Sequence, residues 1–517
     1  MKNNNRYIFG ITLVATLGGL LFGYDTAVIS GTVESLRKFF IDPQGLPADQ
    51  ANALEGFVVS SALIGCIIGA SIAGWLSQRF GRKPSLIVAA ILFAFSAIGS
   101  AWPEIFFGMP GSGDYLFIYY FVAYRIIGGV GVGLASMISP MYIAEIAPSD
   151  RRGNLVSWNQ FAIIFGMLVV YFVNYSIALS GDSQWLNTYG WRWMFASELV
   201  PAFLFFFFLF FVPETPRYLV MRGQDEKAKV VLTKFLGDPA AGKELEAIRE
   251  SFSDKEKRPS TRPYFQFMGV WVVLFLALYG LFELLGNSNA LEIGLILSFV
   301  LSLLLPVRSY GVKILFVGVM LSAFQQFVGI NVVLYYAPEI FKTMGAATNA
   351  ALLQQIIVGA VNLSFTVLAI LTVDRFGRRP LMMIGALVMA VSMIALGTTF
   401  YTHSVGLGSL LCMLVYTAGF AMSWGPVCWV LLAEIFPNSI RSVVMSIAVA
   451  AQWIANFMVS WTFPMLDKNQ YLTEIFNHGV AYWIYGIMGV LAALFIWKFV
   501  PETKGRSLEQ MEEYWNR

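Results

Sequence analysis

Apolar stretches of membrane-spanning length recur along this sequence, and they constrain its fold more than any other feature. A helix that crosses a bilayer needs about 20 mostly apolar residues. Runs of this kind alternate with short charged loops. Only 13% of the residues are charged, against about 25% in soluble domains. The sequence therefore predicts an all-α integral membrane protein, with core spans near 8–36, 55–77, 85–102, 115–137, 155–178, 191–212, 313–337, 351–373, 380–400, 407–433, 440–464 and 479–499.

The two groups of six spans repeat one another. Three motifs recur in the same order and at nearly one spacing: Gln78–Pro84 with Asp374–Pro380, Glu145 with Glu434, and Pro213–Thr215 with Pro501–Thr503. Duplicated units of this kind in a membrane protein are typical of transporters. We therefore expect two pseudo-symmetric six-helix bundles with 12 core spans.

A charged stretch and a second apolar block separate the two bundles. We divide the chain into an N-terminal bundle (1–213), a cytoplasmic helical linker (214–266), an inserted apolar hairpin (267–311), a C-terminal bundle (312–500) and a cytoplasmic tail (501–517). The alternative for 267–311 is an interfacial or buried re-entrant pair. Lys and Arg gather in one set of loops, and the positive-inside rule then places both termini in the cytoplasm.

Asp25 is a carboxylate within the first apolar span. A charge in a membrane span costs about 2.5–3.5 kcal/mol on insertion scales, so such a residue is expected to be paired, hydrated or functional. Arg125 is the formal charge well inside the fourth span, and a helical rise of about 1.5 Å per residue brings the two to overlapping depths. Pairing would offset both costs, and protonation of Asp25 would break the pair. The alternative is a static structural ion pair.

Uncharged amides lie near the expected midplane. Gln325 and Gln452 each fall about 12 residues, roughly 18 Å, from the start of their spans. Amides donate and accept hydrogen bonds without a charge to desolvate, which suits sugar hydroxyls. Hydrogen bonding between helices is an equally good explanation for any single amide. We expect the helix to bend near Gly329 and span ten to break at Gly425-Pro426, because irregular backbone is tolerated where it lines a cavity.

The duplicated motifs resemble those of the sugar porter family of the major facilitator superfamily, over nearly the whole chain except about 255–310. Three further blocks, Phe22–Gly31, Gln325–Tyr336 and Ser423–Trp429, are similar to the bacterial D-xylose–proton symporters of that family. The resemblance implies two six-helix bundles around a central sugar site that works by alternating access.

The resemblance also implies which residues do the work. For proton coupling it implies Asp25, Arg125 and Glu198. For substrate binding it implies Gln160, Gln325, Gln326, Asn331, Asn362, Trp424, Gln452 and Trp453, with Phe22 and Tyr335 as aromatic walls. In one place the sequence departs from the xylose-transporting pattern, because Met167 stands where a Gln is expected. This departure leaves the preference between pentose and hexose open.

Arginines and acids gather at the cytoplasmic ends of both bundles. We predict a cytoplasmic gate, closing when the outer side opens, from Arg79, Arg82, Glu145, Arg152, Glu214, Arg375, Arg378, Glu434, Arg441 and Glu502. Arg pairs bidentately with carboxylates. Single surface ion pairs contribute little, so such a gate would have to act as a network.

The sequence therefore predicts a proton-coupled importer of monosaccharides, with D-xylose the leading substrate and D-glucose another candidate, acting as a monomer in the bacterial inner membrane. The alternatives are an uncoupled facilitator, a symporter for glucose or another hexose, and a membrane sugar sensor that does not transport. No constellation of an enzyme, metal site, cofactor or nucleic-acid interface stands out in the sequence.

Overall fold

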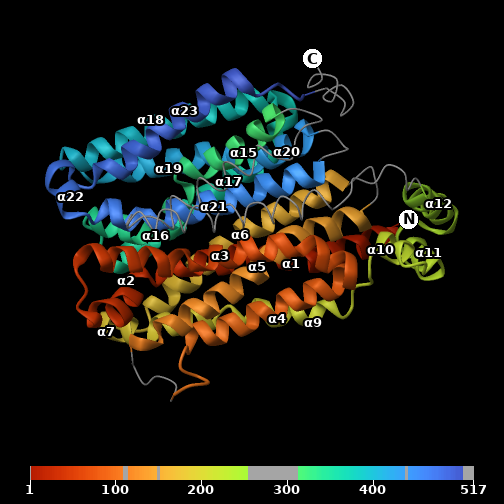
Figure 1. The fold of residues 1–517 in the computed structure, drawn as a ribbon, viewed down its shortest axis with the longest axis horizontal. Coiled ribbons are helices and arrows are strands. Elements are labelled where there is room, and N and C mark those ends of the chain that lie inside the picture. The colour runs from red at the N-terminus through yellow and green to blue at the C-terminus, as the bar shows by residue number, and fades with distance from the viewer. Residues whose placement is uncertain (1, 109–114, 148–151, 254–311, 437–440, 505–517) are drawn as a thin grey trace, which may run out of the picture.

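Two helical lobes lie side by side with their helices running along the long axis of the molecule (Figure 1). The computed structural model describes residues 2–108, 115–147, 152–253, 312–436 and 441–504. The N-terminal lobe contains α1 (Lys2–Val28), α3 (Ala48–Phe80), α4 (Arg82–Ala101), α5 (Ile118–Ile146), α6 (Arg152–Ala178), α8 (Trp191–Ala196) and α9 (Leu199–Leu209).

The C-terminal lobe repeats this plan with two of its spans broken. It contains α15 (Val312–Phe327), α16 (Ile330–Thr343), α17 (Thr348–Phe376), α18 (Arg378–Tyr401), α19 (Leu407–Met422), α20 (Trp424–Ile435), α21 (Arg441–Asp467) and α23 (Gly479–Phe499).

Short elements mark the two ends of the molecule. One end carries η1 (Ile29–Gly31), α2 (Val33–Leu36), η2 (Arg37–Ile41), η3 (Asp42–Gln44), η4 (Tyr115–Phe117), α7 (Ser183–Trp185), η5 (Leu186–Gly190) and α22 (Gln470–Phe476); we call it the α22 end. The opposite end carries α10 (Pro216–Met221), α11 (Asp225–Leu236) and α12 (Asp238–Ser253), and we call it the α11 end. The start of α1 and the last described residues also lie toward the α11 end (Figure 1).

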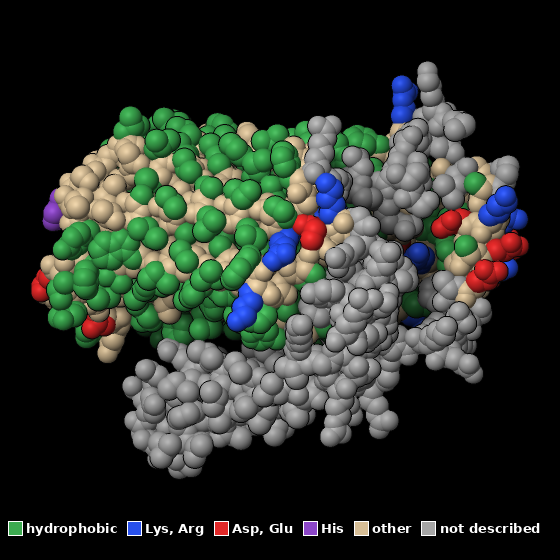
Figure 2. All heavy atoms as spheres, turned by 90° about the horizontal axis from the view of Figure 1, so that it is seen from above, with side chains coloured by type: hydrophobic (Ala, Val, Ile, Leu, Met, Phe, Trp, Pro, Cys, Tyr) green, Lys and Arg blue, Asp and Glu red, His purple; other side chains and the backbone are tan. Residues whose placement is uncertain are grey.

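The predicted all-helical, multi-span architecture is confirmed. Eleven stretches of the described chain are long and apolar enough to cross a membrane, and α21 is a further helix of 27 residues in the C-terminal lobe. Hydrophobic side chains cover most of the face seen between the α22 end and a row of charged residues nearer the α11 end (Figure 2). The inserted hairpin predicted at 267–311 lies outside the described residues.

Small residues allow the helices of the N-terminal lobe to pack closely. A Cβ atom added to Gly65 on α3 would lie 1.9 Å from the carbonyl oxygen of Ile126 on α5. One added to Gly129 on α5 would lie 1.8 Å from the carbonyl oxygen of Ala62 on α3. Within a bilayer the hydrophobic effect does not drive helices together, so close van der Waals packing at small residues stabilises such crossings.

The two breaks in the C-terminal lobe lie near the predicted positions. The first lies between α15 and α16, where Gly329 has a φ of +90°, a conformation that favours glycine. The second was predicted at Gly425-Pro426, but α19 ends at Met422 and α20 begins at Trp424, so the break is at Ser423. Pro426 instead lies in the first turn of α20, where a missing N–H costs no helical hydrogen bond.

Candidate functional site

A cavity of about 870 Å³ lies between the two lobes, within the range of about 300–1,000 Å³ usual for small-molecule sites. Its wall reaches from Phe22 in the middle of the molecule to Ala144 on α5, Val373 on α17 and Arg378 on α18 near the α11 end. The cavity therefore extends toward the α11 end, and the α22 end is closed by contacts between the lobes.

A chain of amides forms the wall on the α15 and α16 side. Asn331 donates a hydrogen bond to Gln326 Oε1, and Gln326 Nε2 donates to Gln325 Oε1 over 3.4 Å. Gln325 Nε2 then donates to the backbone carbonyl of Trp424 over 2.8 Å. The bend at Gly329 makes this chain possible, because it brings Asn331 back over residues that precede it by five or six positions.

Neighbouring helices supply further amides and an aromatic corner. Gln160 on α6 and Asn362 on α17 line the cavity, as does Gln452 on α21. Gln452 Oε1 is buried and has no hydrogen-bond partner among the described residues, so its acceptor capacity is unused. The rings of Phe22 and Trp453 lie 5.7 Å apart at 49° and close one side of the cavity. Aromatic faces beside amides are suited to the apolar and polar sides of a sugar ring.

The prediction that Trp424 contacts the substrate is not matched by its place in the structure. The ring of Trp424 is fully buried, and its Nε1 donates to the carbonyl of Met382 on α18 over 2.9 Å. Trp424 is not among the lining residues, whereas Trp429 is. Five residues of helix separate the two, so their side chains leave α20 in different directions. The other nine predicted substrate residues all line the cavity.

Asp25 and Arg125 form an ion pair within the N-terminal lobe. Arg125 Nη1 lies 2.6 Å from Asp25 Oδ1, and the two side chains are 1% and 0% exposed. Arg125 Nη2 also donates to the backbone carbonyl of Asp25 over 3.1 Å. A pair this deeply buried is strongly constrained, since removing either partner leaves an uncompensated charge.

Glu198 belongs to the same cluster. The structure buries Glu198 completely and places it near Asp25 and Arg125, as the resemblance implied. Neither of its carboxyl oxygens, nor Asp25 Oδ2, has a hydrogen-bond partner among the described residues. With both acids ionised the three groups carry a net charge of −1, and one added proton would make them neutral and satisfy an unpaired oxygen.

Tyr335 connects the cavity to this cluster. It lines the cavity from α16, hydrogen-bonds with Asn456, and lies near Asp25 and Arg125. Tyr335 therefore stands between the cavity and the buried charges.

At the α11 end, arginine–glutamate pairs occupy matching positions in the two lobes. Arg82 Nη2 lies 2.8 Å from Glu145 Oε1 in the N-terminal lobe. Arg378 Nη2 lies 3.0 Å from Glu434 Oε1 in the C-terminal lobe. Each pair joins helices of one lobe only, so the pairs are intact while the lobes are apart at this end.

The remaining predicted gate residues fall into three groups. Glu214 accepts a hydrogen bond from the backbone N–H of Lys83 over 3.1 Å, and Glu502 accepts one from that of Arg378 over 3.1 Å, which suits acids at helix N-termini. The guanidinium of Arg79 lies over the rings of Trp75 and Phe80. The side chains of Arg152, Arg375 and Arg441 lie outside the described residues.

Comparisons with known proteins converge on sugar transport. The family model described as "Sugar (and other) transporter" matches residues 11–292 and 298–515. The D-xylose-proton symporter of Escherichia coli K12 is 57% identical, over 99% of this chain and 96% of its own. The glucose facilitated diffusion protein of Zymomonas mobilis is 39% identical, over 99% and 98%. A solved structure of the xylose transporter XylE from E. coli in an inward-open conformation is 54% identical, covers 98% of this chain and 100% of its own, and has a TM-score of 0.81.

Proposed function

This chain belongs to the sugar transporter family, and from that premise we propose that it is a D-xylose–proton symporter that works by alternating access. It is a multi-pass membrane transporter and not an enzyme. The 57% identity to the E. coli D-xylose-proton symporter extends over the full chain. The cavity suits the substrate, because its amides and aromatic rings offer hydrogen bonds and a stacking face, and Arg378 lies at its α11 end.

The observation that carries the proton coupling is the composition of the buried cluster. Two acids, Asp25 and Glu198, share one base, Arg125. A fully buried net charge is strongly disfavoured, so the cluster favours one bound proton whenever it is closed off from water. A facilitator without coupling would have no need of the second buried acid.

The side of the membrane to which the cavity opens follows from the orientation proposed for the chain. If the α11 end is cytoplasmic, as the distribution of Lys and Arg indicates, the cavity opens inward and both termini are cytoplasmic. The likeness to the inward-open xylose transporter supports this orientation. We also propose that the protein lies in the bacterial inner membrane and works as a monomer. The five-part division of the chain given above belongs to the same proposal.

The deciding experiment is uptake into proteoliposomes. Vesicles holding the purified protein receive labelled D-xylose or D-glucose, with or without an acid-outside pH gradient. We expect D-xylose to accumulate above its external concentration only when the gradient is present. Equal equilibration with and without the gradient would instead establish an uncoupled facilitator, and accumulation of glucose in preference to xylose would reassign the substrate.

Met167 favours a second candidate function, transport of a hexose such as glucose. It lines the cavity at a position where the xylose-transporting pattern expects a glutamine, so one hydroxyl partner is missing. A facilitator of glucose diffusion is also among the relatives. The relative uptake of the two sugars in the same vesicles separates the candidates.

We expect Met167→Gln to tighten D-xylose binding. A gained hydrogen bond contributes about 0.5–1.5 kcal/mol, which corresponds to roughly a two- to tenfold lower Kd. Isothermal titration of the purified protein with D-xylose measures the change. Met167→Leu keeps an apolar side chain of similar size and should leave the Kd unchanged; an equal gain in both variants would rule out the amide as its cause.

A further inference from the structure

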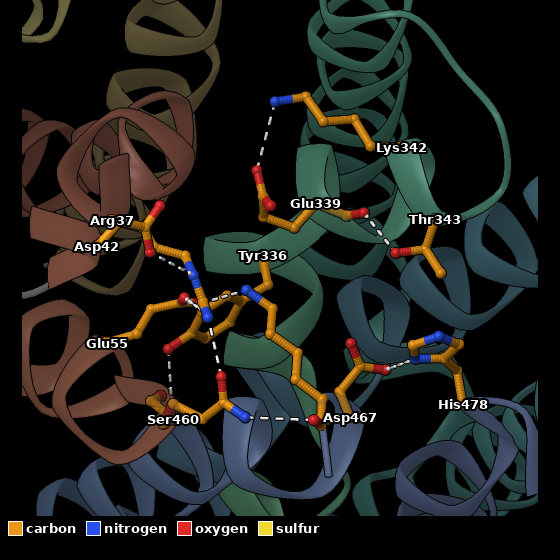
Figure 3. A network of polar contacts seen from close by, with 12 residues as sticks. Arg37, Asp42, Glu55, Tyr336, Glu339, Lys342, Thr343, Ser460, Asp467 and His478 are labelled. Carbon is orange, nitrogen blue, oxygen red and sulfur yellow. Dashed lines mark hydrogen bonds and ion pairs between the residues drawn. The ribbon is translucent and has the colours of Figure 1, made fainter. Parts of the chain in front are cut away.

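At the α22 end, one buried carboxylate is shared between cations of both lobes. Glu55 lies on α3 of the N-terminal lobe, and its side chain is 2% exposed. Arg37 Nη1, from η2 of the same lobe, lies 2.5 Å from Glu55 Oε2. Lys468 Nζ, which follows α21 of the other lobe, lies 2.6 Å from Glu55 Oε1. Arg37 and Glu55 point toward one another in Figure 3.

The surrounding contacts hold each cation in its place. Arg37 Nε lies 3.4 Å from Asp42 of its own lobe, and Arg37 Nη1 donates to Asn52 Oδ1 over 3.0 Å. Asn52 Nδ2 in turn donates to the carbonyl of Lys468 over 3.2 Å. Asp467, beside Lys468 in sequence, contacts His478 instead: its Oδ1 lies 3.2 Å from His478 Nδ1 (Figure 3). Lys468 is therefore directed to Glu55.

The lobes touch closely around this carboxylate. Trp461 Nε1 on α21 donates to the carbonyl of Ala53 on α3 over 3.1 Å. A Cβ atom added to Gly56 would lie 2.1 Å from the carbonyl oxygen of Trp461. These contacts have to part whenever the cavity opens toward the α22 end.

A second shared carboxylate lies nearby and follows the same pattern. Glu34 on α2 is bonded to Lys38 of its own lobe and to Lys342 on α16 of the other lobe. Lys342 also lies 3.4 Å from Glu339 of its own helix (Figure 3). Glu55, Glu34 and Lys342 thus each have an ion-pair partner in their own lobe that stays with them when the lobes separate. Lys468 forms its ion pair among the described residues with Glu55 of the other lobe, although Glu339 of its own lobe lies near enough to interact with it.

The two cations bonded to Glu55 behave differently when the lobes separate at the α22 end. Lys468 leaves with the C-terminal lobe when this end opens, whereas Arg37 remains with Glu55. A carboxylate that stays buried after losing its last partner is an uncompensated charge, and Arg37 prevents that loss. The pair with Lys468 therefore stabilises only the closed state, and the pair with Arg37 stabilises the open state relative to a bare carboxylate.

We propose that Arg37, Glu55 and Lys468 form a shared-carboxylate lock, a set of positioning residues that fixes the ratio of outward-facing to inward-facing transporter. Lys468 holds the outer end closed, and Arg37 permits it to open. The inference rests on the proposed function only for its premise of alternating access. It requires neither D-xylose as the substrate nor a coupled proton.

The lock is tested by measuring the distance between the lobes directly. Spin labels are attached at Gln184→Cys and Asn349→Cys, two exposed positions at the α22 end in opposite lobes. Pulsed electron paramagnetic resonance then measures the distance between the labels, which increases when the α22 end opens. Cys412, which is partly exposed, is replaced by Ser. Measurements are made without sugar or a pH gradient, so a wrong substrate or the absence of coupling leaves the readout intact.

The two cations give opposite expected results. Lys468→Gln raises the ratio of open to closed outer ends by roughly three- to tenfold, as loss of a partly buried ion pair implies. Arg37→Gln lowers the ratio of open to closed ends. The conservative variants Lys468→Arg and Arg37→Lys keep the positive charge and should each show the wild-type ratio. Glu55→Gln, which keeps the shape of the side chain, raises the ratio and replaces Lys468→Gln if that variant does not fold. Shifts of the same sign for both cations, or no shift, would overturn the lock.

Discussion

We expect the Asp25→Asn variant to lose concentrative sugar uptake and to retain exchange of sugar across the membrane. The cluster of Asp25, Arg125 and Glu198 carries one negative charge in excess when fully ionised, which a single proton removes. Without the carboxylate of Asp25, Arg125 and Glu198 already balance, so nothing remains for a proton to neutralise.

The size of the effect follows from the driving force. One charge moving through 100 mV releases about 2.3 kcal/mol, and about 1.4 kcal/mol corresponds to a tenfold ratio. The wild-type protein can therefore accumulate sugar roughly 50-fold at that potential, whereas the variant should reach only the external concentration. Counterflow of labelled D-xylose in the same vesicles measures the exchange that we expect to survive.

A second buried ion pair provides the matched control. Arg192 Nη1 lies 2.9 Å from Glu104 Oε1 in the same lobe, and both side chains are nearly fully buried. We expect Glu104→Gln to lower thermal stability but to leave accumulation dependent on the pH gradient. If Asp25→Asn still concentrates sugar, the buried cluster is a static structural pair and the symport mechanism is wrong.

Gln325→Ala should weaken D-xylose binding by about 10- to 100-fold. Gln325 joins the amide chain from Asn331 and Gln326 to the carbonyl of Trp424. Its removal deletes one ligand contact and also leaves Gln326 without its acceptor. Buried polar groups left unpaired cost about 1–3 kcal/mol each, and 1.4–2.8 kcal/mol corresponds to this range of affinity.

The control for that prediction is an amide that bonds a backbone carbonyl away from the cavity. Asn174 on α6 is fully buried and donates to the carbonyl of Val28 over 3.2 Å. Asn174→Ala should lower the melting temperature and leave the Kd for D-xylose within about twofold. Titration calorimetry and thermal unfolding on both variants separate loss of binding from loss of folding. Similar losses of affinity in both would mean that Gln325 acts through stability alone.

The sequence was most informative where a residue conflicts with its surroundings. Asp25 and Arg125 are charges within apolar spans, so the helical rise alone was enough to bring them to one depth. Gly329 likewise interrupts an apolar run between amides that could not otherwise share a face. In each case the energetic conflict restricts the structure to very few solutions.

Features that depend on the exact start of a helix could not be predicted. Which of Trp424 and Trp429 faces the cavity depends on how α20 is rotated about its axis, which Gly425-Pro426 did not reveal. Glu198 was placed near a solvated end, because nothing in the sequence showed that the chain before it is coiled as α7 and η5. Glu55 was taken as the first residue of a span, although α3 begins at Ala48, and its role in joining the lobes depends on residues more than 400 positions away.

The bend at Gly329 has a mechanical consequence. A Cβ atom there would lie 2.7 Å from the ring of Tyr485, so the bend rests against α23 like the fulcrum of a lever. Beyond it, α16 presents Asn331 and Tyr335 to the cavity and ends near Lys342, about 20 Å along the helix from the bend. A tilt of α16 about this bend would therefore displace Lys342, and its contact with Glu34 of the other lobe, farther than it displaces the cavity residues near the bend.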